Sequence, residues 1–131
     1  MLPEGFYDWK PDSEAMTAIQ IIRHVLQADY GWNMIINKEG MDNYHTPWDG
    51  RFYFSVDDEL IFAEPYRQNF LQSVRNFSGQ QLADIIIHPG SGSENFLGNY
   101  LLRSAYHESV HAGQFISYLR EIGVERPFIW D

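Results

Sequence analysis

The chain has 131 residues, no cysteine, and 18 acidic residues against nine basic ones, which gives a formal net charge of −9. The length predicts one domain, residues 1–131, and the lack of cysteine excludes disulfides and thiolate metal ligands. So few basic side chains cannot neutralise many phosphates, and we therefore expect neither nucleic acid nor an anionic membrane as a partner. No signal-peptide pattern and no membrane-length apolar run is present, so a cytoplasmic location is expected.

The first long helix is predicted from Glu14 to Asn37. Residues 1–10 before it contain proline and glycine without helical periodicity and are predicted to form a loop. Asp12 or Ser13 is the expected N-cap, and Gly40 is expected to end the segment. A broad apolar surface recurs along this stretch at helical spacing.

The connection of residues 39–57 is rich in glycine, asparagine, aspartate and proline. We interpret it as an ordinary surface loop, with a cover over a pocket as the alternative, because irregular loops of this length are often functional. A second helix is predicted to follow, capped by Ser55 or Asp57 and ending near Asn76. Pro65 within it predicts a kink or a late helix start.

A short extended piece is predicted over residues 83–89, where the sequence ADIIIHP contains three consecutive isoleucines. His88 precedes a proline, which favours extended geometry, so it is predicted to be a loop residue rather than a ligand. The last helix is predicted over residues 95–122, with Gly123 as its stop.

His107 and His111 are four residues apart in this last helix, which places both imidazoles on one face with Cβ atoms about 6 Å apart. Such a pair can bind one divalent metal ion, or the two rings can be partly buried and bonded to carbonyl groups. A third histidine, His24, lies near the middle of the first predicted helix and favours the metal site. A purely structural bundle with coincidental histidines stays open.

Residues 107–111 also match the H-E-x-x-H motif of zinc peptidases, in which the glutamate is the general base. Only twenty residues follow His111 to supply a third ligand. The extended form of the motif requires glycine and histidine where this chain has Gln114 and Ser117. A peptidase is therefore the weaker interpretation.

The last helix resembles the C-terminal helix of the DinB-like (YfiT-type) family, which has two histidines four apart, then Gly-Gln, then a Leu-Arg-x-x-Gly ending. The matching residues are His107, His111, Gly113, Gln114, Leu119, Arg120 and Gly123. The beginning is similar as well, with Leu2-Pro3-Glu4, Trp9-Lys10-Pro11, and then His24, Ala28, Asp29 and Trp32.

This resemblance implies an all-α fold of the antiparallel four-helix-bundle type. It also implies that His24, His107 and His111 bind one divalent metal ion, zinc or nickel. The implied activity is that of a hydrolase or a thiol S-transferase acting on a small molecule, with a low-molecular-weight thiol as a candidate co-substrate. The alternative is a non-catalytic bundle that binds a metal or a small ligand.

Family members have a further helix before the point that matches Leu2. The resemblance therefore implies that this helix is missing or supplied by a partner. Because three helices leave an apolar groove exposed, we expect a homodimer that covers it.

No catalytic residue is assigned from the sequence. Glu108 is adjacent to a ligand and projects about 100° away from it on a helix, which argues against a catalytic role. Four residues on the histidine face are candidates for binding a cofactor or lining the pocket: Gln114, Tyr100, Ser104 and Tyr118. For Gln114, a hydrogen bond to a ligand or bound water and a packing amide stay equally open. Trp32 and Trp48 are weaker candidates.

Overall fold

Helices make up most of the computed structural model, which describes residues 2–38, 44–88 and 94–127. The elements in chain order are the 3₁₀ helix η1 (Glu4–Phe6), α1 (Ala18–Ile36), α2 (Val56–Asn76), α3 (Gly79–Asp84), β1 (Ile86–Ile87), β2 (Asn95–Phe96) and α4 (Leu97–Glu121). The predicted helical bundle class is thereby confirmed, with β1 and β2 as a small antiparallel pair. Within the described residues, no helix is both long and apolar enough to cross a membrane.

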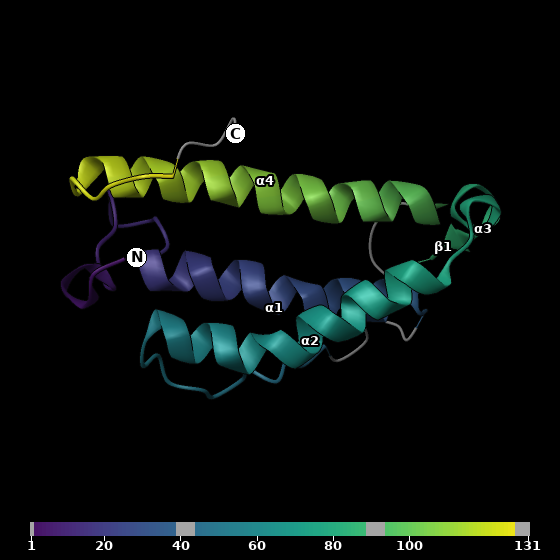
Figure 1. Ribbon diagram of the computed structural model, residues 1–131, viewed down its shortest axis with the longest axis horizontal. Helices are drawn as coiled ribbons and strands as arrows, with labels where there is room; N and C mark the ends of the chain where they lie inside the picture. The colour runs from purple at the N-terminus through teal and green to yellow at the C-terminus, as the bar shows by residue number, and fades with distance from the viewer. Residues whose placement is uncertain (1, 39–43, 89–93, 128–131) are drawn as a thin grey trace.

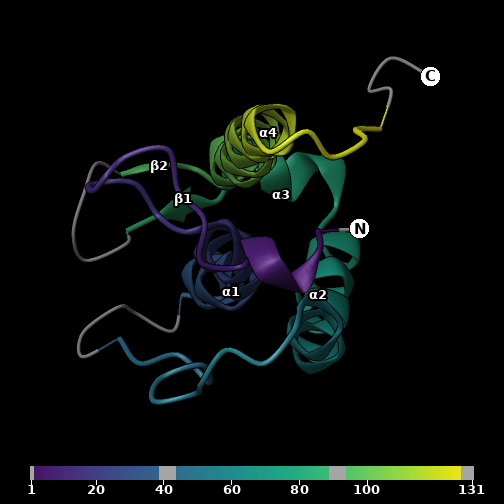
Figure 2. The ribbon, with the colours of Figure 1, turned by 90° about the vertical axis from the view of Figure 1, so that its left-hand side faces the viewer.

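Helix α1 is central and contacts both α2 and α4 (Figures 1 and 2). Helix α4 runs antiparallel to α1, whereas α1 and α2 run in the same direction (Figure 1). This parallel pair requires the long connection between α1 and α2, because the chain must return along the length of the bundle before α2 begins. Seen end-on, α2 and α4 flank α1 on two of its sides (Figure 2).

Helix α1 begins at Ala18, later than the predicted start at Glu14. Thr17 is the N-cap and forms a capping box: its hydroxyl accepts from the Gln20 amide, and the Gln20 side chain accepts from the Thr17 amide. The predicted cap, Asp12, instead accepts from the amides of residues 14 and 15 in a separate turn before the helix. Helix α1 ends at Ile36, and Gly40, the predicted end, lies outside the described residues.

Helix α2 begins as predicted, with the Ser55 hydroxyl accepting from the amide of Asp58 at 3.0 Å. The helix is continuous through Pro65, which rules out a late start. Figure 1 shows a bend near the middle of α2, where this proline lies, in agreement with the predicted kink.

The segment after α2 differs in part from the predicted extended piece. Ser78 and Gln81 form a second capping box and start the short helix α3, which includes Ala83 and Asp84. Of the predicted extended piece, residues 86 and 87 form strand β1, which pairs with residues 95 and 96 of β2. Pro89 of the predicted piece lies outside the described residues.

Helix α4 runs from Leu97 to Glu121, slightly shorter than predicted, and Gly123, the predicted stop, follows two residues later. Gly123 has φ +72°, the left-handed region that glycine tolerates best. Its amide donates to the Arg120 carbonyl and the Val124 amide donates to the Leu119 carbonyl, so these two carbonyls in the last turn are satisfied.

Two apolar clusters hold α1 and α4 together. The first joins the N-terminal end of α1 to the C-terminal end of α4 and contains Leu2, Ala18, Ile21, Tyr118 and Leu119. The second joins the opposite ends to α2 and the strands and contains Ile36, Phe70, Ile87, Leu97 and Tyr100. The stretch of the α1–α4 interface between these clusters is where the three histidines lie.

A buried ion pair fastens the connection before α2 to the bundle. Glu59 is fully buried and accepts from Arg23 Nε at 2.9 Å and from Trp48 Nε1 at 3.2 Å. Arg23 also donates to the carbonyl groups of Arg51 and Phe52 at 2.6 and 2.9 Å. The described part of the connection is thus bonded to side chains of α1 and α2.

Candidate metal centre

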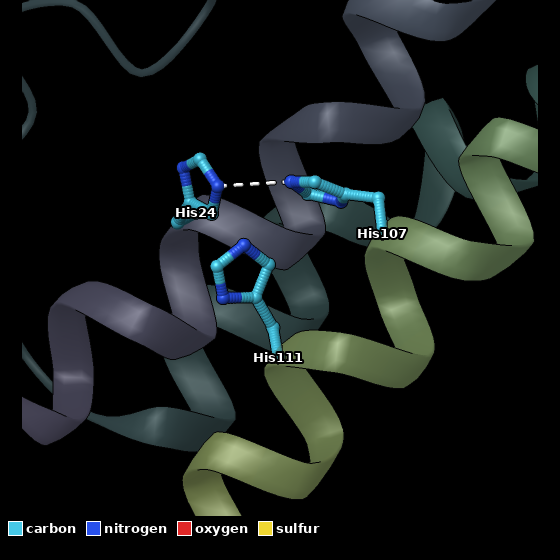
Figure 3. Close-up of side chains that lie close together, drawn as sticks. All are labelled: His24, His107 and His111. Carbon is cyan, nitrogen blue, oxygen red and sulfur yellow. Dashed lines mark hydrogen bonds between the residues drawn. The ribbon is translucent and has the colours of Figure 1, made fainter.

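The structure brings together three imidazoles, one from α1 and two from α4 (Figure 3). The Nε2 atoms of His24 and His107 are 2.9 Å apart. The ring centroid of His111 lies 4.6 Å from each of the other two centroids. One potential ligand nitrogen from each residue lies within 4.8 Å of the others, and all three side chains are partly buried.

This arrangement has the dimensions of a metal site. Zinc–imidazole bonds are about 2.0–2.1 Å long, so ligand nitrogens on one ion lie roughly 3–3.5 Å apart. The observed separations need only small ring adjustments to reach these values. Three histidines without a carboxylate or thiolate form a donor set that suits zinc, nickel, copper or iron.

Burial favours the form of the ring that binds a metal. Desolvation lowers the pKa of His24, and the neighbouring His111 lowers it further. Desolvation also lowers the pKa of His107, with smaller contributions from His111 and His24 in the same direction. Because only a neutral imidazole offers a lone pair to a metal ion, both effects favour the ring form that could bind one.

Two further side chains lie directly against the histidines. The side-chain oxygen of Gln114 lies 3.0 Å from His111 Nδ1. The ring of Trp32 meets the ring of His107 edge-on, with centroids 6.3 Å apart. Both were candidates from the sequence, and their contacts make them neighbours of the site.

The other predicted pocket residues have contacts elsewhere. The Tyr118 hydroxyl donates to the Met16 carbonyl at 3.0 Å, and its buried ring belongs to the first apolar cluster. Tyr100 is buried in the second cluster. The Ser104 hydroxyl donates to the Leu101 carbonyl, one turn earlier in α4. Ligand binding by these three residues stays a prediction. Trp48 packs on Phe62 and Tyr66 of α2.

An ionic group that the sequence did not predict links α1, α2 and α4. Arg67 Nη1 lies 3.0 Å from Asp29 Oδ1 and 3.5 Å from Glu108 Oε2. Asp29 is buried, and this burial raises its pKa above the ordinary value, although the charge of Arg67 opposes the shift. Glu108 is therefore engaged with Arg67 and is not among the three grouped histidines. That it has no catalytic role stays a prediction.

A groove between α2 and α4, floored by α1, runs past this ionic group. It consists of two adjoining hollows of about 220 Å³ each that share Val25, Leu26 and Glu108. The first also touches His111 and Phe115, and the second is lined by Leu60 and Arg67. We call this surface the α2–α4 groove.

A family model for the DinB superfamily matches residues 1–115. The chain belongs to the DinB superfamily. Among solved structures, the crystal structure of the DinB-like protein YjoA from Bacillus subtilis is similar, with a TM-score of 0.69 and 22% sequence identity. The match covers 96% of this chain and 83% of that one. None of the curated proteins searched matches this sequence.

The geometry of the histidine site also bears on the peptidase interpretation. In this DinB-superfamily chain the third imidazole comes from α1, which precedes the H-E-x-x-H residues, and not from the segment after them. Glu108, the residue that a peptidase would use as its base, is bonded to Arg67. Both observations weigh against peptidase chemistry.

Proposed function

We propose that this DinB-superfamily protein binds one divalent metal ion, zinc or nickel, through His24, His107 and His111, and that it is a metal-dependent enzyme of the hydrolase or thiol S-transferase type. The single observation that carries this proposal is the convergence of three imidazoles from two helices on one point. Three protein ligands leave coordination positions free for a water molecule or a substrate.

A divalent ion bound here supplies Lewis acidity, which lowers the pKa of a bound water molecule or thiol toward neutrality. The residues of the chain supply the rest. The three histidines are held between two apolar clusters and are only partly buried, which supports access by a small molecule. Trp32, beside His107, offers an apolar wall for an organic substrate.

Hydrolase or transferase activity is tested with protein loaded to one equivalent of zinc or nickel. The substrates are activated esters, and an electrophilic aryl halide with glutathione-type thiols. We expect turnover that is lost on chelation, restored by the metal, and absent in His24→Ala. His88→Ala is the matched control, because His88 is exposed and paired with Glu94. Full metal loading without turnover of any substrate would favour a non-catalytic binding protein.

We also propose that the protein is a homodimer in which a second copy covers the α2–α4 groove. The apolar side chains of this groove include Leu60, which is 48% exposed. Its rim carries both Arg67 and the acidic Glu64 and Glu108. A two-fold interface pairs one surface with itself, so the arginine of each copy can meet the acidic residues of the other.

Light scattering coupled to size-exclusion chromatography tests this assembly. We expect twice the chain mass for the wild-type protein and a monomer for Leu60→Lys, because the interface would then have to bury a charged side chain in place of an apolar one. Leu102→Lys is the control and should stay dimeric: Leu102 is 69% exposed but lines a different hollow, beside α3 and β2. A monomeric wild-type protein would exclude this interface.

A further inference from the structure

Gln114 and His111 form a specific pair on one face of α4. They are three residues apart, and Gln114 Oε1 lies 3.0 Å from His111 Nδ1, which is a good hydrogen-bond distance. Both side chains are partly buried, so water competes less for this bond than it would at an exposed site.

The bond has a consequence for the other side of the ring. A neutral imidazole carries one N–H, and an amide oxygen can only accept, so with the Gln114 oxygen facing the ring this contact favours the proton on Nδ1. The lone pair then lies on Nε2. Figure 3 shows one ring nitrogen of His111 directed into the gap between His24 and His107. Since Nδ1 faces Gln114, this nitrogen is Nε2.

The three histidines are not equivalent in this respect. Within residues 2–38, 44–88 and 94–127, no hydrogen bond from the protein fixes the Nδ1 atom of His24 or His107. Their Nε2 atoms instead face each other at 2.9 Å, where one must donate to the other as long as no ion lies between them. In the described part of the chain, His111 is therefore the one histidine of the three whose Nδ1 is held by a side chain outside the histidine group.

We infer that Gln114 is a positioning residue that holds His111 in its Nδ1–H tautomer and makes this ring the pre-arranged anchor of the metal site. Outer partners of this kind orient a metal-binding histidine and raise its basicity. The inference rests on the proposed metal-binding function and adds a role that the three ligands do not define. A glutamine that served only to pack α4 would not control the tautomer.

The tautomer can be measured without any metal. Long-range ¹H–¹⁵N spectra of the apo protein at about pH 8 distinguish Nδ1–H from Nε2–H rings. We expect His111 as Nδ1–H in the wild-type protein and a shift toward Nε2–H in Gln114→Leu. Gln72→Leu, at an exposed glutamine of α2, is the control and should leave the His111 signals unchanged. A wild-type Nε2–H ring, or no change in Gln114→Leu, would overturn the inference.

Metal affinity provides the second measurement. Competition with a chelator should show zinc binding weakened by about 10–100-fold in Gln114→Leu. Gln114→Glu should bind at least as tightly as the wild type, because its carboxylate also accepts from Nδ1–H. Ser117→Glu adds the same charge at an exposed position of α4 and should not strengthen binding to the same extent.

The two measurements separate this inference from the proposed function. If the wild-type protein binds no metal, the proposed function fails, while the tautomer spectra still decide the role of Gln114. If the wild type binds zinc and Gln114→Leu binds it equally well with an unchanged His111 ring, the proposed function stands and the inference fails.

Discussion

Replacing His111 with alanine is expected to abolish stoichiometric binding of the divalent ion. The variant removes the ligand that lies 4.6 Å, centroid to centroid, from both other rings, and two imidazoles alone hold zinc or nickel weakly. The loss of affinity should exceed the roughly 10–100-fold that follows from removing an outer-sphere partner.

Element-resolved mass spectrometry after metal loading and gel filtration measures this effect. The wild-type chain should retain about one ion, and His111→Ala should retain almost none. His88→Ala, an exposed histidine paired with Glu94, should keep the wild-type content. Equal metal content in all three proteins would remove the proposed site, and circular dichroism would verify that His111→Ala is folded.

Replacing Glu59 with alanine is expected to cost about 3–5 kcal/mol in the free energy of unfolding, because it leaves a buried charge without its partner. Arg23 is only 6% exposed, and among the described residues it would keep the two carbonyl acceptors in the connection before α2 and the ring of Tyr53. The indole of Trp48 would lose its acceptor at the same time.

Urea unfolding followed by circular dichroism measures this effect. Glu121→Ala, at an exposed position at the end of α4, should change the free energy of unfolding by less than about 0.5 kcal/mol. The double variant Arg23→Met, Glu59→Leu should be markedly more stable than Glu59→Ala, since it removes both charges together. Equal stabilities of Glu59→Ala and Glu121→Ala would show that this ion pair contributes little.

The helix ends that the sequence predicted well are those with one strong local signal. For α2, the two predicted caps, Ser55 and Asp57, are only two residues apart, and Ser55 is the cap; for α4, Gly123 follows the last helical residue by two positions. Before α1 two signals compete: Asp12 caps only a turn, and the Thr17–Gln20 box starts the helix. In the segment after α2, local capping by Ser78 prevailed over the β propensity of the isoleucines for residues 83 and 84.

The candidate site was predictable because its ligands are histidines at a recognisable spacing. The pairs Arg23–Glu59 and Asp29–Arg67 were not, because each joins residues of α1 and α2 that lie more than 30 positions apart in sequence. An arginine and an aspartate within an apolar helix weakly indicate that each has an oppositely charged partner. The sequence does not show which residue that partner is. The contact of Gln114 with His111, at a spacing of three, was one of two readings that the sequence left open.

The apolar clusters at the two ends of the α1–α4 interface contain none of the three histidines. Cohesion of the two helices and chemistry at their middle therefore depend on separate sets of side chains. A lineage that inherits this scaffold can exchange its imidazoles for other donors, or dispense with them, without redesigning the contacts that keep the helices together. Such independence is a physical reason why one bundle architecture can accommodate descendants with different reactions, and others with none.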